Sequence, residues 1–324
     1  MNYTYQKFNL KGHERPIVNA QFNLDGDMFL TSSIDKTVCV WCALTCRLLH
    51  QFKEFTAAVR AAEFSPDSNY IAAGQNDTEL FVFDLSTMRV SHQRTLPPGI
   101  KGARSVHWRP DMSSFLVVTA SYGASVQVLE YAFSPSQPLG PPARAAALEC
   151  SPVSSFLLNE VLYIGCDSGN LLFFNAETFE IDEIEDLGYP AADISLFRDA
   201  YVAIACTKAR KVYVYDAREK FALKTEFDVN TFCAHPTLEI GVLGGGIDAK
   251  SVTTTSNVDA TLVTQFYDLE HKTLIWEQKL HAGPSWRVRW SPDGLGMISV
   301  AEDASSVFIR FESSFLGYSF KAEW

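Results

Sequence analysis

Residues 33–41 read Ser-Ile-Asp-Lys-Thr-Val-Cys-Val-Trp, and the pair Gly12-His13 begins the segment that ends there. Between Gly12-His13 and residues 33–41 lie two stretches with the alternating pattern of β-strands, residues 17–22 and 29–33. The turn signal Asp25-Gly26 separates them. A third strand ends at Trp41, and residues 48–52 read as a fourth. The segment therefore predicts a small antiparallel sheet of four strands.

The same pattern ends seven times along the chain, at an aromatic or apolar residue that is usually followed by an acid. The endings are Val40-Trp41, Phe83-Asp84, Leu129-Glu130, Phe174-Asn175, Tyr215-Asp216, Tyr267-Asp268 and Arg310-Phe311. A period of about 40 to 45 residues is the sequence mark of β-propeller blades. Seven such blades account for all 324 residues. We therefore expect an all-β, seven-bladed propeller that forms a single domain over residues 1–324.

The two ends of the chain indicate how the ring closes. Little chain remains after Phe311 for a complete outer strand, whereas residues 3–10 alternate and belong to no repeat. We expect the N-terminal strand to complete the last blade, because this removes two free sheet edges. Residues 315–320 are the alternative candidate for the same place.

The bulk composition narrows the function. A net charge of −11 repels phosphate backbones, so we expect no direct nucleic-acid binding. No run approaches the ~18 apolar residues that a membrane span requires. The seven cysteines are scattered over strand positions, which favours free thiols in a reducing compartment over a disulfide framework.

One stretch breaks the repeat. Residues 134–143 contain four prolines, which cannot donate hydrogen bonds to a sheet. We expect an exposed inter-blade loop there, between blades three and four. A proline-rich ligand for another protein is the alternative function of this loop.

The first repeat resembles the WD40 pattern of a Gly-His pair, a Ser-x-Asp turn and a terminal Trp. In WD40 repeats these residues form a buried hydrogen-bonded set, and the resemblance implies a structural tetrad of His13, Ser33, Asp35 and Trp41. Such a network stabilises a fold only when every member is satisfied. The same residue types would also make a serine hydrolase triad, but the sequence has no nucleophile elbow.

A second resemblance is more specific. Residues 242–255 read Val-Leu-Gly-Gly-Gly-Ile-Asp-Ala-Lys-Ser-Val-Thr-Thr-Thr and are similar to a stretch of subunit i of eukaryotic translation initiation factor 3. Residues 10–17 and 280–284 are similar to two further stretches of that family. The signature residues are Gly244, Gly245, Gly246, Asp248, Thr253, Thr254 and Thr255. A nucleotide-binding loop is disfavoured, because Lys250-Ser251 follows no adjacent glycine and begins no helix.

This resemblance implies a non-catalytic scaffold in the cytoplasm that uses no cofactor or metal. It implies contacts with subunits b and g of initiation factor 3, in the module that recruits mRNA and scans on the small (40S) ribosomal subunit. In that family a helix of subunit b is bound near blades five and six. The glycines of residues 244–246 are expected where backbone must bend or approach closely.

Carried over to this chain, the helix-binding surface involves five residues. The resemblance implies Asp228 and Asp216 as contacts. Tyr213 and Tyr215 are both candidate apolar contacts, but strand alternation lets only one of them face outward, and Tyr213 is the one included. Where the family has an acid in the blade-five turn, this chain has Lys208 and Arg210, which reverses the local charge. We therefore expect a compensating change on the partner helix.

Other functions remain as alternatives. A different WD40 scaffold, such as a receptor-kinase-associated or coat-type propeller, would share the general repeats. An enzyme or small-molecule propeller would need convergent charged residues in its central channel, and the sequence shows no periodic set of that kind. The acids of residues 182–186 indicate a solvated turn between blades four and five, or a dock for a basic partner.

Isolated metal and redox motifs have simpler explanations. Cys39 and Cys42 are spaced as Cys-x-x-Cys, but they lie at a strand end and no second pair completes a zinc site. His107, His235 and His281 occupy similar places in different blades, which a ring holds far apart.

Overall fold

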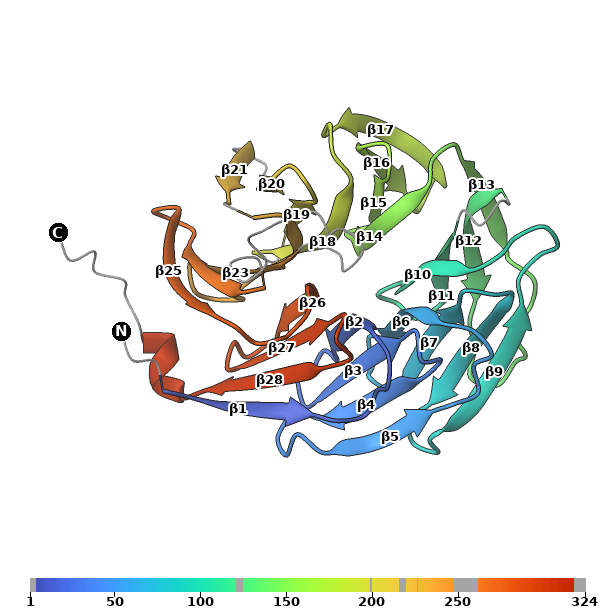
Figure 1. The fold of residues 1–324 in the computed structure, drawn as a ribbon. Coiled ribbons are helices and arrows are strands. Elements are labelled where there is room, and N and C mark those ends of the chain that lie inside the picture. The colour runs from blue at the N-terminus through green and yellow to red at the C-terminus, as the bar shows by residue number, and fades with distance from the viewer. Residues whose placement is uncertain are drawn as a thin grey trace.

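The computed structural model describes residues 4–120, 125–198, 200–215, 220–225, 227–246 and 262–317. Its strands form seven antiparallel sheets of four strands each, arranged in a ring (Figure 1). The prediction of a seven-bladed all-β propeller is confirmed. Asp216, Asp248, Thr253, Thr254 and Thr255 lie outside the described residues.

Each of the first six blades is built from four consecutive strands, which run in chain order from the inner to the outer edge. Blade one contains β2 (Ile17–Phe22), β3 (Met28–Ser33), β4 (Val38–Cys42) and β5 (Leu48–Phe52). Blade two contains β6 (Val59–Phe64), β7 (Tyr70–Gln75), β8 (Glu79–Asp84) and β9 (Arg89–Thr95). Blade three contains β10 (Ala103–Trp108), β11 (Ser114–Thr119), β12 (Val126–Ala132) and β13 (Arg144–Leu148). Blade four contains β14 (Pro152–Leu158), β15 (Val161–Cys166), β16 (Asn170–Asn175) and β17 (Glu180–Asp186). Blade five contains β18 (Ala191–Phe197), β19 (Tyr201–Cys206), β20 (Lys211–Tyr215) and β21 (Lys220–Lys224). Blade six contains β22 (Val229–Ala234), β23 (Ile240–Gly245), β24 (Thr264–Asp268) and β25 (Thr273–Gln278).

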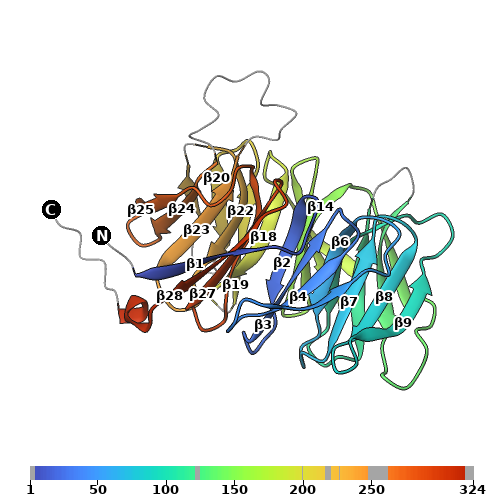
Figure 2. The ribbon, with the colours of Figure 1, turned by 60° about the horizontal axis from the view of Figure 1, so that its bottom comes forward.

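The seventh blade combines the two ends of the chain. It contains β26 (Ser285–Trp290), β27 (Gly296–Ala301), β28 (Ser306–Phe311) and β1 (Tyr5–Leu10). Strand β1 runs antiparallel to β28 from Tyr5 opposite Phe311 to Leu10 opposite Ser306, and Figure 2 shows the two strands side by side. The expected closure by the N-terminal strand is confirmed. Residues Ser313–Gly317 form a short 3-10 helix, η3, after β28.

The core of the propeller lies between the blades. Each of seven clusters of buried side chains joins two neighbouring blades, because both faces of every sheet are apolar. The cluster at the closure contains Leu10, Trp41 and Phe308, which come from the blades at the two ends of the ring. No helix among the described residues is long and apolar enough to cross a bilayer.

The innermost strands share one irregularity. In all seven of them the pairing register shifts after the first residue, so that the second residue is bulged. A bulge re-aims the side chain of the extra residue. The seven bulged residues are Val18, Arg60, Arg104, Val153, Ala192, Asn230 and Trp286, and we call them the bulge ring.

Two predictions about connecting segments were wrong. The proline-rich residues 134–143 join β12 to β13 inside blade three and do not lie between blades, since residues 144–148 form the outer strand of that blade. The acids of residues 182–186 belong to β17, the exposed outer strand of blade four, and do not form a turn. In both cases the outer strand is weakly apolar, so its pairing is not visible in the sequence.

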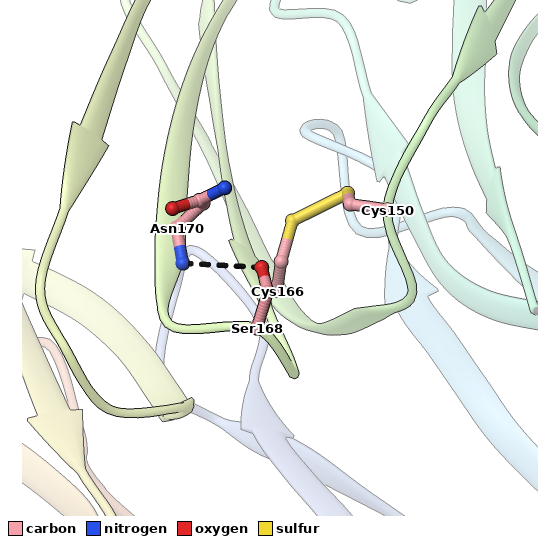
Figure 3. Close-up of a disulfide and its surroundings, with 4 residues drawn as sticks. All are labelled: Cys150, Cys166, Ser168 and Asn170. Carbon is pink, nitrogen blue, oxygen red and sulfur yellow. Dashed lines mark hydrogen bonds between the residues drawn. A yellow bond between two sulfur atoms is a disulfide. The ribbon is translucent and has the colours of Figure 1, made fainter.

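The cysteine prediction needs a correction as well. Cys150 and Cys166 form a disulfide, with their Cα atoms 6.0 Å apart (Figure 3). The hairpin of β14 and β15 brings these residues together, because Cys150 precedes the first strand and Cys166 ends the second. The other five cysteines are free. Burial raises the pKa of the Cys39 thiol to about 12, so the Cys-x-x-Cys spacing supplies no reactive pair.

The tetrad of blade one forms with one substitution. His13 Nδ1 lies 2.9 Å from Asp35 Oδ2, and His13 Nε2 lies 2.8 Å from the hydroxyl of Thr31. The Trp41 indole donates to that same Thr31 hydroxyl at 2.9 Å. The hydroxyl of the tetrad therefore belongs to Thr31, and the assignment of Ser33 was wrong.

Ser33 has a separate role beside the tetrad. Its hydroxyl donates to the carbonyl oxygens of Arg15 and Pro16 and accepts from the Asp35 amide at 3.0 Å. Burial would raise the pKa of Asp35, but the hydrogen bonds from His13, Thr37 and the Glu14 amide outweigh burial and hold the pKa at about 2. The tetrad is a structural network, because the Thr31 hydroxyl is already bonded to both His13 and Trp41.

Blade seven contains a similar set that the sequence reading missed. His281 Nε2 lies 2.8 Å from the Ser299 hydroxyl and its Nδ1 lies 2.6 Å from the Ser305 hydroxyl. Asp303 accepts from Ser305 and from the Ala282 amide. Burial lowers the pKa of His281 to about 4. The sequence could have indicated this set, because a His, a strand hydroxyl and a turn Asp recur here as in blade one. Ile309 stands at the position that Trp41 has in blade one.

A double-mutant cycle tests the corrected tetrad. Trp41→Phe removes only the indole N–H, so its coupling with Thr31→Val should be at least about 1 kcal/mol in the free energy of unfolding. Its coupling with the control Ser33→Ala should be near zero. Urea denaturation of wild type, the single variants and the two double variants measures both couplings. Equal coupling for the two hydroxyls would contradict the assignment to Thr31.

The blade-seven histidine predicts a pH dependence. Folding lowers the pKa of His281, so the unfolded chain binds the proton more tightly than the folded chain. The full free energy of unfolding is therefore present above the unfolded pKa of about 6.5, and it decreases as the pH falls toward about 4. Between about pH 7.5 and about pH 5, His281 should account for a loss of about 2 kcal/mol. His281→Gln should flatten this slope in urea melts. An unchanged slope would show that His281 does not titrate in this way.

Candidate functional site

The glycine signature lies where blade six meets its neighbours. A Cβ on Gly245 would lie 2.1 Å from the carbonyl oxygen of Asp228, and one on Gly244 would lie 2.8 Å from the Cβ of Ser285. Gly246 has a φ of 129°, which disfavours any side chain. The glycines therefore let β23 approach both the segment before β22 and blade seven. They fix the position of Asp228, the acid predicted for partner binding.

Asp228 is paired within the chain. Its carboxylate lies 3.4 Å from Arg210 Nε, across the gap between the blade-five turn and the segment that enters blade six. Both side chains are partly exposed, so the pair contributes little stability and remains available to other charges. Two of the residues predicted for partner binding are therefore brought together, and they neutralise each other.

The turn between β19 and β20 supplies a second charge beside this pair. Lys208 and Arg210 both have positive φ, of 65° and 50°, in a tight turn of residues 207–210. Lys208 and Asp228 line the same mouth of the central cavity. Two basic residues, Lys208 and Arg210, and one acid, Asp228, therefore lie near one rim of the cavity.

Tyr213 lies elsewhere. It is half-buried in the cluster between blades four and five, whereas its neighbours Val212 and Val214 are in the cluster between blades five and six. Because side chains alternate along a strand, Tyr213 and Asp228 are on opposite sides of blade five. The structure gives no support for Tyr213 as a member of one surface with Asp228.

The centre of the ring holds an ion network that the sequence did not predict. Asp193 of β18 is buried and bonded to Arg289 at 2.7 Å and to Arg287 at 3.0 Å. It also accepts from the Thr231 hydroxyl at 2.5 Å. Burial would raise the pKa of Asp193, but the two arginines and Thr231 hold it lowered. These contacts connect blades five, six and seven across the inner strands.

The three histidines considered as a metal set are separate. His107 lies 3.1 Å from Glu63, His235 is bonded to the Gly294 carbonyl oxygen, and His281 belongs to the blade-seven set. Within the described ranges no three His, Cys, Asp or Glu side chains gather as a metal site would require.

Gly245→Ala tests the role of the signature in placing Asp228. Overpacking against the Asp228 carbonyl should lower the free energy of unfolding by about 2 kcal/mol or more. Gly140→Ala is the control, because a Cβ there meets no atom within 4 Å, and it should stay within about 0.5 kcal/mol of wild type. Similar thermal denaturation of the two variants would exclude the close approach.

Comparison with known proteins agrees with this architecture. A family model described as WD domain, G-beta repeat, matches residues 4–42 and 46–84, which end at the third strands of blades one and two. These ranges include β1 and the tetrad residues His13, Asp35 and Trp41. The Trp that ends the first repeat is replaced in blade seven.

Proteins of one name are similar to the chain from end to end. Eukaryotic translation initiation factor 3 subunit I from Pyricularia oryzae is 25% identical over 97% of this chain and 95% of that protein. The proteins of the same name from Schizosaccharomyces pombe and Vanderwaltozyma polyspora are 24% and 26% identical, over 96% and 97% of this chain and 98% and 94% of their own length. By its ring and its repeats the chain is a seven-bladed β-propeller with WD40 repeats, and over its full length it is similar to proteins named eukaryotic translation initiation factor 3 subunit I.

Proposed function

We propose that this protein is a non-catalytic scaffold subunit of a translation initiation factor 3 complex. The similarity to proteins named as subunit I of that factor, which spans 97% of the chain, carries the proposal. The polar sets of the described blades support it, since their hydroxyl and carboxylate groups are already bonded inside the fold. Such groups hold sheets together and are not poised for chemistry.

The partners proposed are subunits b and g of the factor, with the 40S ribosomal subunit contacted through the complex during mRNA recruitment and scanning. The site proposed for subunit b is the rim formed by Lys208, Arg210 and Asp228. Helix-in-groove recognition with charge steering is the physical mode that fits a rim of mixed charge. Because basic side chains outnumber the acid here, we expect a partner helix with acidic residues facing blade five.

The location proposed is the cytoplasm, where initiation takes place. Five free cysteines agree with a reducing compartment. The Cys150–Cys166 disulfide is an observation against a reducing compartment. No contact with a membrane or directly with nucleic acid is proposed, since the chain carries a net charge of −11.

Affinity capture from native lysate, followed by mass spectrometry, tests the proposal as a whole. The tagged full chain should recover the other subunits of initiation factor 3 in stoichiometric amounts. Recovery of signalling or coat proteins in their place would assign the chain to another class of WD40 scaffold. Turnover of any substrate by the purified chain would contradict the non-catalytic assignment.

Charge reversal tests the rim. Asp228→Lys and Lys208→Glu should each change the affinity for the C-terminal segment of subunit b by about tenfold, mostly through the association rate. Asp77→Lys and Lys101→Glu are matched controls at positions near blade two. Calorimetry of the four variants at two salt concentrations measures the effect. If the affinities of both rim variants equal that of wild type, subunit b does not bind at this surface.

A further inference from the structure

The central channel is a large internal space of the propeller. It has a volume of about 1310 Å³ and is lined by the inner strands of all seven blades. Small-molecule sites usually enclose about 300–1,000 Å³, so the channel has room for a ligand and water. All seven residues of the bulge ring line it.

One end of the channel presents hydrogen-bond donors. The bulge ring contains Arg60, Arg104, Asn230 and Trp286, together with three apolar residues, and it contains no carboxylate. Arginine and indole N–H groups donate and do not accept. Arg104 already donates to the Val153 carbonyl oxygen and Asn230 to the Gly246 carbonyl oxygen. Arg60 Nε and Trp286 Nε1 are the donors at this end that would take an acceptor from a ligand, and an anion supplies one.

The channel is also positively charged, in contrast to the chain as a whole. Its lining includes six basic residues and three acids among those described, whereas the chain has a net charge of −11. The basic residues are Arg60, Arg104, Arg198, Lys208, Arg287 and Arg289, and the acids are Glu63, Asp193 and Asp228. A cleft of one sign inside low-dielectric walls concentrates ions of the opposite sign.

The three acids of the channel are already bound. Glu63 accepts from the Trp108 amide and lies 3.1 Å from His107, and Asp228 is paired with Arg210. Asp193 is shared between Arg287 and Arg289. One carboxylate for two partly buried guanidinium groups leaves an excess of positive charge next to Trp286 of the bulge ring.

Two donors at this end have no acceptor. Arg60 Nε and Trp286 Nε1 are buried and make no hydrogen bond within the described part of the chain. Three effects lower the pKa of Arg287: burial, the charge of Arg289 and the charge of Arg60. Buried polar groups almost always have a partner, and unpaired buried charge is costly. An anion inside the channel would supply an acceptor to both donors.

We propose that the bulge-ring end of the central channel binds a small, multiply charged anion of the phosphate class, such as a phosphorylated small molecule. Arg60 and Trp286 donate to its oxygens. Arg104, which belongs to the ring, and Arg287, which follows Trp286 in β26, contribute positive charge. Guanidinium forks fit phosphate oxygens in paired geometry, which favours phosphate over a simple halide. The inference does not rest on the proposed function, because Arg60 and Trp286, which carry it, are not part of the rim proposed for subunit b.

Calorimetry on the full chain, with inorganic pyrophosphate and inositol hexakisphosphate as probes, tests the site. At least one probe should bind saturably with one site per chain, and citrate should bind at least about tenfold more weakly. Trp286 lines the site, so tryptophan fluorescence should change with the same midpoint. Absence of saturable binding of both probes would overturn the proposal.

Variants of one blade locate the binding. Arg60→Met keeps the apolar stem and should weaken probe binding by at least about tenfold. Arg60→Lys keeps the charge and should recover part of the affinity. Arg89→Met is the control, because Arg89 is exposed on the outer strand of the same blade. Far-UV circular dichroism checks folding, and subunit capture should be unchanged in all three. Equal probe affinity of Arg60→Met and wild type would exclude the bulge ring.

Discussion

The structure depends on the burial of both faces of every sheet against a neighbouring sheet. Each of the seven apolar clusters is shared by two blades, so no blade has a core of its own. The first and last blades must therefore meet, and β1 makes this possible by pairing with β28. Closure removes the two edges that an open array of sheets would expose.

Polar groups inside this apolar ring are held in local networks. The His13 and His281 sets lie in single blades, whereas Asp193 with Arg287 and Arg289 reaches across the inner strands to another blade. Removing one partner from such a set leaves a buried group without its bond, which costs more than the bond itself contributes. The Asp193 network therefore connects blades five, six and seven, whereas the two histidine sets stabilise single blades.

The two proposed sites use different parts of the ring. The rim at Lys208, Arg210 and Asp228 lies where glycines allow blade six to approach blade five, and it presents charges to a macromolecule. The bulge ring lines the channel itself, and its member Asn230 follows Asp228 of the rim by two residues. A register shift repeated in every inner strand re-aims one side chain per blade toward the axis, and in this chain two of the seven are arginines. The same device that shapes the ring therefore creates the site.

The sequence by itself determined the number of blades, the ends of their third strands and the closure by residues 5–10, because alternation and turn residues are local signals. Tertiary structure decided what depends on register or on ring closure. Thr31 and Ser33 point to the same face of one strand, so only the pairing of β3 with β4 selects which hydroxyl meets Trp41. Arg60 and Arg287 are far apart in the chain and share no periodic pattern. They line the same channel only because the closed ring brings the inner strands of all blades around a common axis.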